Sequence, residues 1–138
     1  MATTTATNAG SLTVGGIPYS PERISVLQTV FDASATPIPN GDTHNLLAIP
    51  EGFLVLYSSA KVTTVEGAAD TLDLRCGTTV LINEVDVNTA ARTNSATARM
   101  VPSGGEYINF TTGAAAAAVA VAVIEVSVLV IDMRVTLD

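Results

Sequence analysis

Aromatic side chains, cysteine, histidine and positive charge are all scarce in this chain of 138 residues. Aromatic residues make up 4% of it and tryptophan is absent, so the core has to be built from valine, isoleucine, leucine and alanine. The single cysteine, Cys76, has no partner for a disulfide within the chain. Leu72 and Leu74 share its strand parity, which predicts a buried and inert thiol. The single histidine, His44, is expected to be an ordinary edge-strand residue, because zinc sites need clustered ligands and no Gly-x-Ser-x-Gly elbow offers a nucleophile.

Basic residues are few and scattered. The chain has 6 lysines and arginines against 13 acidic residues, for a formal net charge of −7, and no two basic residues are adjacent. A nucleic-acid-binding surface needs clustered positive charge. The sequence therefore predicts no nucleic-acid partner.

Motifs that bind phosphate or metal are missing as well. The glycine pairs at 15–16 and 104–105 lack the following Lys-Ser/Thr that completes a phosphate loop. Asn83, Asp86 and Asn88 only approach the spacing of a calcium loop. Most carboxylates fall at turns or on outward strand positions, where a solvated charge is ordinary. We expect no cofactor, no metal site and no enzymatic activity.

One long apolar run, residues 113–132, has the length of a membrane span. Its composition favours a strand, because β-branched residues dominate from Val119 onward. A charge such as Glu125 costs about 2.5–3.5 kcal/mol at the centre of a spanning helix but little on the solvent face of a strand. The run predicts a β-strand over 119–132 and no membrane partner. Its buried face carries Ile124, Val126, Val128 and Val130, and the opposite face carries Glu125, Ser127 and Leu129.

Period-2 alternation and turn signals recur along the rest of the chain. A turn is predicted at Pro39-Asn40-Gly41-Asp42, since Asn and Gly tolerate positive φ. Residues 88–98 are small and polar and are predicted to form a loop. The pattern predicts an antiparallel β-sandwich or barrel with no sustained helix. The other predicted strands cover residues 23–32, 44–49, 53–64, 71–76, 80–87, 99–101 and 107–112.

Strand parity also assigns side chains to faces. In the first predicted strand, Ile24, Val26 and Val30 share one face. The strand over 53–64 is expected to put two groups of side chains on opposite faces. One group is Leu54, Leu56, Ala60 and Val62, and the other is Tyr57, Ser59, Lys61 and Thr63.

The amino-terminal segment differs from the rest in composition. Residues 1–16 are mostly Thr, Ala, Asn and Gly, with few apolar side chains and no secretory signal, so we expect the protein to stay in the cytoplasm of the cell that makes it. The chain is thus divided into a flexible arm, residues 1–22, and a β-sandwich domain, residues 23–138. The arm is either a disordered tail or a segment that orders against a neighbour through Leu12, Val14 and Ile17.

Five segments in this order resemble tailed-bacteriophage virion structural proteins of the capsid decoration (cement) or head-fibre type. They are IPEG at 49–52, TLDLRCG at 71–77, VDVNTA at 85–90, YINF at 107–110 and the valine-rich strand at 119–132. The resemblance covers about residues 45–135. It implies a jelly-roll-like, all-β antiparallel sandwich that is commonly trimeric and serves as a capsid decoration protein. It implies no catalytic residues.

Two partners follow from this resemblance: further copies in a homotrimer, and the major capsid protein at the capsid surface of the virion. Leu129 and Ile131, on the face opposite the core, are the expected subunit or capsid contacts, together with Leu12, Val14 and Ile17. A phage fibre or spike domain is one alternative. A carbohydrate-binding β-sandwich module is another, although it would usually need exposed aromatic side chains or a calcium site.

Overall fold

The structure is a computed structural model that describes residues 12–14, 17–19, 23–112 and 118–134. The described residues form strands and turns and contain no α-helix, as the sequence predicts. Among them there is thus no helix long and apolar enough to cross a membrane. The strands are β1 (Leu12–Val14), β2 (Ile17–Tyr19), β3 (Ile24–Asp32), β4 (Thr43–Ile49), β5 (Phe53–Thr64), β6 (Thr71–Cys76), β7 (Thr79–Asp86), β8 (Arg92–Ser95), β9 (Arg99–Met100), β10 (Glu106–Thr112) and β11 (Val123–Asp132).

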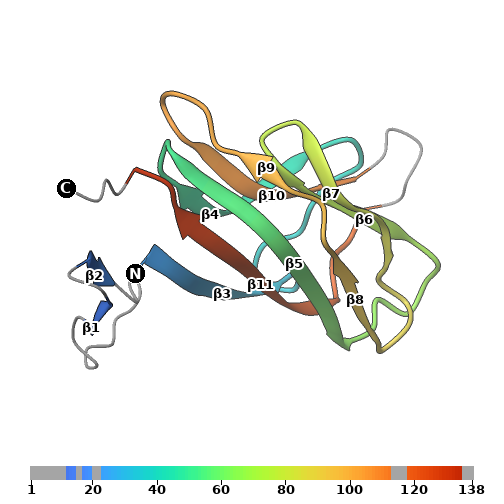
Figure 1. Ribbon diagram of the computed structural model, residues 1–138. Coiled ribbons are helices and arrows are strands. Elements are labelled where there is room, and N and C mark those ends of the chain that lie inside the picture. Colours follow the sequence, from blue (N-terminus) through green and yellow to red (C-terminus); the bar gives the residue numbers. More distant parts are fainter. Residues whose placement is uncertain (1–11, 15–16, 20–22, 113–117, 135–138) are drawn as a thin grey trace.

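Two antiparallel sheets face each other and form a sandwich (Figure 1). One sheet has the order β4-β10-β6-β7, and the other has the order β3-β11-β5-β8 with β9 also paired to β5. Because β8 and β9 pair with the same strand, they act as one interrupted strand. In each sheet, neighbouring strands then alternate between the first and the second half of the sandwich, an order of the kind found in jelly-roll-like sandwiches. The predicted fold class, an all-β antiparallel sandwich, is confirmed.

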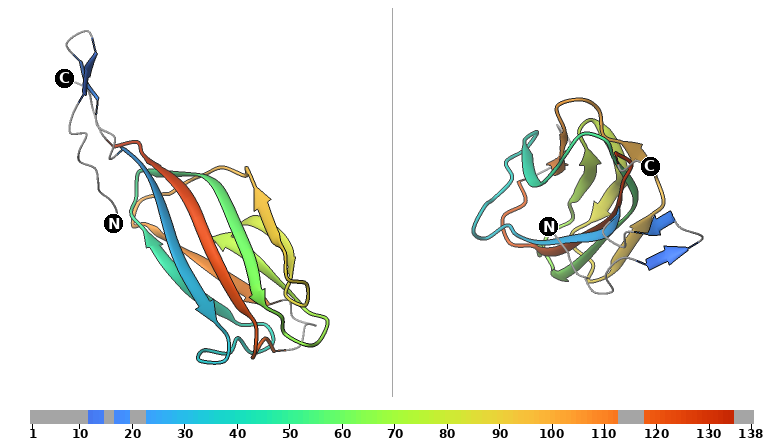
Figure 2. Two further views of the ribbon diagram at one scale, coloured as in Figure 1. Left: turned by 90° about the horizontal axis from the view of Figure 1, so that it is seen from below. Right: turned by 60° about the vertical axis from the view of Figure 1, so that its left-hand side comes forward.

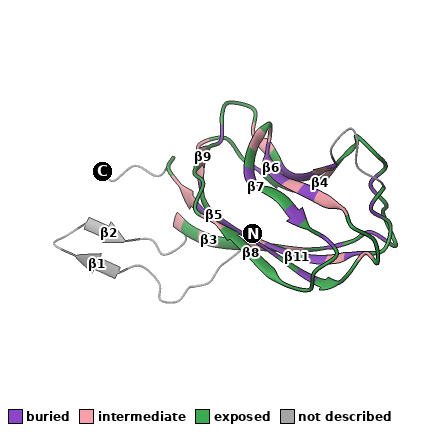
Figure 3. Ribbon diagram, turned by 90° about the vertical axis from the view of Figure 1, so that its right-hand side faces the viewer, coloured by how far each residue is buried: buried purple, intermediate pink, exposed green. Residues whose placement is uncertain are grey.

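The core lies between the sheets, and buried residues run along both layers (Figure 3). Strand β11 is central to one layer, between β3 and β5, and Figure 2 shows these three strands side by side. Ile124, Val126, Val128 and Val130 are each 0% exposed, so the predicted alternation is confirmed. On the opposite layer, Phe110 meets Phe31 edge to face with ring centroids 5.5 Å apart.

Strand β11 begins four residues later than the sequence predicts, at Val123 rather than Val119. Val119 forms an isolated bridge with Ile38 instead, through hydrogen bonds of 2.9 and 3.0 Å. The next three backbone N–H groups, of residues 120–122, donate to the Glu66 carboxylate, each at 2.9 Å. With their N–H groups directed to a side chain, these residues cannot donate to a neighbouring strand, although the Ala122 carbonyl still accepts a hydrogen bond from Ala33 N–H at 2.9 Å.

The predicted faces of β5 are wrong in its first half. Leu129 pairs with Tyr57, and the next residue, Val130, pairs with Val55, so Leu56 is an extra residue in a β-bulge. The bulge shifts the parity, so that Val55 is 0% exposed whereas Leu56 is 38% exposed. Beyond the bulge, Ala60 and Val62 are buried as expected.

The segment over 88–98 is not wholly a loop. Residues 92–95 form β8, which pairs antiparallel with β5 from Ser58 to Lys61. All but one of the β8 side chains are exposed, so no apolar alternation marks the strand in the sequence. Residues 92–95 form a strand because they pair with an exposed edge of β5, and not because of any apolar alternation of their own.

Strands β1 and β2 form a separate two-stranded antiparallel hairpin within the predicted arm. Leu12, Val14 and Ile17 therefore lie on paired strands, although their side chains are not described. Residues 1–11, 15–16 and 20–22 lie outside the described residues. The boundary between an arm and a sandwich at residue 22 stays a prediction.

Candidate interface on the five-stranded sheet

Three large apolar side chains of β3 are exposed on the outer face of the five-stranded sheet. Ile24, Val26 and Val30 are 49%, 58% and 61% exposed. The alternate residues of β3 point inward, and Phe31 among them is 2% exposed. The shared parity of the three exposed residues is thus confirmed, and their common face is the outward one.

The register across the sheet joins these residues to outward positions on β11 and β5. Ile24 lies opposite Ile131, which lies opposite Leu54. In the next row, Val26 lies opposite Leu129, which lies opposite Tyr57. Side chains opposite one another on antiparallel strands are about 4.5–5.5 Å apart at Cβ, so the rows are continuous. We call this surface the apolar half-face; its members are Ile24, Val26, Leu54, Tyr57, Leu129 and Ile131.

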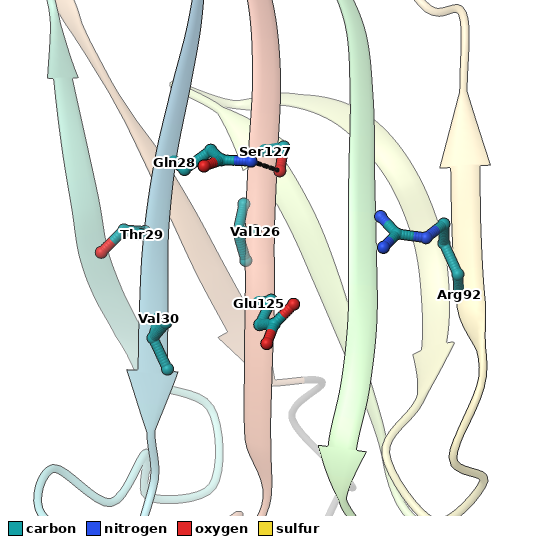
Figure 4. Close-up of a pocket in the computed structure, with 7 residues that line it drawn as sticks. All are labelled: Gln28, Thr29, Val30, Arg92, Glu125, Val126 and Ser127. Carbon is teal, nitrogen blue, oxygen red and sulfur yellow. Dashed lines mark hydrogen bonds between the residues drawn. The ribbon is translucent and has the colours of Figure 1, made fainter. Parts of the chain in front are cut away.

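The other half of the same face is polar apart from Val30. Gln28 donates a hydrogen bond to Ser127 at 3.3 Å, and Arg92 donates one to Ser59 at 2.7 Å. Glu125 of β11 lies between Val30 of β3 and Lys61 of β5 in the next row. These rows border an open depression of about 380 Å³, drawn in Figure 4 with Gln28, Glu125, Ser127 and Arg92 around it.

The apolar half-face is specific to this sheet. On the outer face of the four-stranded sheet, the large exposed apolar residues are Tyr107 on β10 and Val80 on β7, and β6 separates these two strands. Side chains with another strand between them do not form a continuous patch. Surface apolar residues that stand singly are ordinary in soluble proteins, whereas large contiguous apolar patches often belong to interaction sites.

A cluster of ionisable groups that includes the single cysteine lies elsewhere, beside the β6–β7 turn. Arg99 donates two hydrogen bonds to the Glu106 carboxylate, at 2.9 and 2.7 Å. Cys76 lies 3.5 Å from the same carboxylate and is 0% exposed. Burial, with a further contribution from Glu106, raises the pKa of the Cys76 thiol to about 12. A thiol is a nucleophile only as thiolate, so Cys76 is inert, as predicted.

The remaining candidates for chemistry have structural surroundings. His44 lies on the edge strand β4, as expected, with its ring 5.2 Å from that of Phe31. The residues that the structure describes contain no group of three or more His, Cys, Asp or Glu side chains placed to hold a metal ion. What this arrangement offers chemically is an apolar surface beside a polar one, which suits binding to another protein.

Of the predicted contact residues, the structure brings Leu129 and Ile131 together on the apolar half-face. Their role as contacts stays a prediction, as does that of Leu12, Val14 and Ile17. Sequence reasoning missed Ile24, Val26 and Tyr57 as members of the same surface. The parity of Ile24 and Val26 was visible, but only strand register shows that they lie beside Leu129 and Ile131.

Comparison by sequence finds no matching protein-family model and no matching curated protein. Comparison by structure does find neighbours. One is a chain of the acidic stable capsid structure of Helicobacter pylori bacteriophage KHP30, with a TM-score of 0.52 and 20% identity over 78% of this chain and 86% of that chain. Another is a chain of the cyanophage Pam1 capsid asymmetric unit, with a TM-score of 0.55 and 16% identity over 95% of this chain and 99% of that chain. This chain therefore shares its fold with chains of two bacteriophage capsid structures.

Proposed function

We propose that this protein is a structural component of a bacteriophage virion, and more narrowly a capsid decoration (cement) protein that binds and stabilises the assembled head. The observation that carries the proposal is the likeness in fold to chains of two phage capsid structures. In the cyanophage Pam1 structure, the match covers 99% of the similar chain. Such a role is non-enzymatic and places the protein on the capsid surface of the virion.

The surface of the sandwich supports the same role. A decoration protein has to remain soluble before assembly and bury apolar area afterwards. The net charge of −7 favours solubility, and the apolar half-face provides area to bury. The proposed partners are further copies of this chain, in a homotrimer, and the major capsid protein.

Co-sedimentation tests the proposal. Heads assembled without this protein are mixed with increasing amounts of the purified chain and pelleted, and the heads are then heated until they release their DNA. We expect saturable binding and release at a higher temperature when the protein is bound. A protein that stays in the supernatant at every concentration, with unchanged heads, contradicts a decoration role.

Glycan binding is the outcome that would replace this proposal. The same preparation is applied to a glycan array with and without EDTA. Binding that EDTA abolishes, in a protein that does not pellet with heads, would instead indicate a carbohydrate-binding module.

A further inference from the structure

The register of the β1–β2 hairpin places its apolar positions on one face. Leu12 pairs with Tyr19, and Val14 pairs with Ile17. Directly opposite residues share a face of an antiparallel pair, and so do residues two apart on one strand. All four positions therefore share one face, whereas Thr13 and Pro18 share the other.

A two-stranded hairpin of this size needs a surface to pack against. An isolated hairpin is at best marginally stable in water, because it has no third strand and no second layer to bury its apolar face. Within the described residues, β1 and β2 pair only with each other. The apolar half-face on the five-stranded sheet also needs cover, since Ile24, Val26 and Tyr57 are exposed and its other three members are only half-buried.

The two surfaces fit each other in size. The hairpin presents two rows of two apolar positions, and the apolar half-face presents two rows of three. In both, the rows are two residues apart, or about 7 Å along a strand, and neighbouring strands are about 4.8 Å apart. The four apolar positions of the hairpin thus fit within the area of the six positions of the apolar half-face.

Chain connectivity favours a second copy as the acceptor. Only residues 20–23 join Tyr19 to Ile24, and Ile24 is itself at the end of the apolar half-face. To cover its own sheet, the hairpin would have to reverse direction within this link and rise about 10 Å, the spacing of stacked sheets. Packing on a second copy imposes no such reversal on the link.

We propose that the β1–β2 hairpin of one copy packs its Leu12, Val14, Ile17 and Tyr19 face on the apolar half-face of a second copy. The contact is head-to-tail, so it closes when each subunit of a ring gives its hairpin to the next. This inference rests on the self-association within the proposed function and identifies the surfaces that make it.

Cross-linking between two differently tagged copies tests the contact. One full-length copy carries Ile17→Cys and the other carries Val26→Cys, and the two are co-expressed. A bis-maleimide with a reach matched to the ~10 Å spacing of stacked sheets is then added. Cys76 is a suitable background, since it is 0% exposed. We expect a species of twice the 14.1 kDa chain mass that carries both tags.

Two matched pairs control for chance proximity. Thr13→Cys replaces Ile17→Cys on the other face of the hairpin, and Val30→Cys replaces Val26→Cys four residues further along β3. Both pairs should give far less of the doubly tagged species. Equal cross-linking in all three pairs would show non-specific collision and overturn the proposal.

A chain that carries both Ile17→Cys and Val26→Cys distinguishes the acceptor. A link within one chain, seen as a monomer of altered mobility, would show that the hairpin covers its own sheet and would overturn the proposal. So would the absence of any link. Binding to heads is measured on the same preparations, so a protein that pellets with heads without cross-linking loses this inference and keeps the proposed function.

Discussion

At the scale of single residues, the side chain of Glu106 restricts which residue can occupy position 77, in the turn after β6. Gly77 has φ +61°, in the left-handed region that side chains with a Cβ rarely adopt. A Cβ at this position would also overlap the carboxylate of Glu106. That carboxylate is held in place by two hydrogen bonds from Arg99. Glycine is thus required by the backbone and by its surroundings.

Replacing Gly77 with alanine should therefore lower the free energy of unfolding by about 1–3 kcal/mol, measured by urea denaturation. Gly41→Ala is the matched control, because Gly41 has φ +80° and a Cβ at that position would meet no atom within 4 Å. The control isolates the backbone cost. Equal losses in the two variants would mean that the Glu106 side chain yields freely and contributes nothing to the requirement.

At the scale of elements, one carboxylate decides where β11 begins. The Glu66 oxygens accept hydrogen bonds from the backbone N–H groups of Ala120, Val121 and Ala122. Burial by itself would raise the pKa of Glu66, but these three donors outweigh it and hold the pKa below its ordinary value of 4.5. The contact joins the segment after β5 to the start of β11.

The depressed pKa of Glu66 predicts a pH dependence. A carboxyl group whose pKa is lower in the folded state stabilises the fold above its unfolded pKa, and this stability is lost as the pH falls through the folded pKa. Glu66→Gln should lower the free energy of unfolding by about 1–2 kcal/mol at pH 7. The difference from the unmodified protein should shrink below pH 4.5, in urea titrations at a series of pH values.

Glu125→Gln is the control for this series, because Glu125 is an exposed residue on the outer face of β11. It should leave the free energy of unfolding nearly unchanged at pH 7. A Glu66→Gln variant that matches this control across the pH series would show that the carboxylate does not hold the segment.

At the scale of the whole molecule, the two faces of the five-stranded sheet differ in how far they are covered. The inner face is buried by the second sheet, whereas the apolar half-face on the outer side has no cover within the described part of the chain. Removal of apolar surface from contact with water is the main driving force for association. We therefore expect the free protein to associate through this surface.

Val26→Glu should convert a trimer into a monomer, measured as molar mass by light scattering after size exclusion. Val26 is 58% exposed, so the charge should disrupt association with little change in the free energy of unfolding. Leu129→Glu should act in the same direction. Gln28→Glu places the same charge two residues away, on the polar half, and should leave the mass unchanged. Four proteins of identical mass would exclude the apolar half-face from the subunit contact.

Much of the fold could be predicted because strand alternation is a local property. The buried parity of β11 and the positions of most strands follow from residues that are neighbours in the sequence. Three features could not be found in this way. The bulge at Leu56, the strand β8 and the late start of β11 each depend on a partner distant in sequence: Leu129 and Val130, β5, and Glu66 respectively.

The sequence by itself determined an all-β sandwich with an aliphatic core, an inert cysteine and an outward position for Leu129 and Ile131. Each of these depends on composition or on the two-residue period of a strand. Only the tertiary structure decided that Ile24, Val26 and Tyr57 lie beside those two residues, because register across strands is set by pairing between distant segments. A surface made of three strands exists only after those strands have paired.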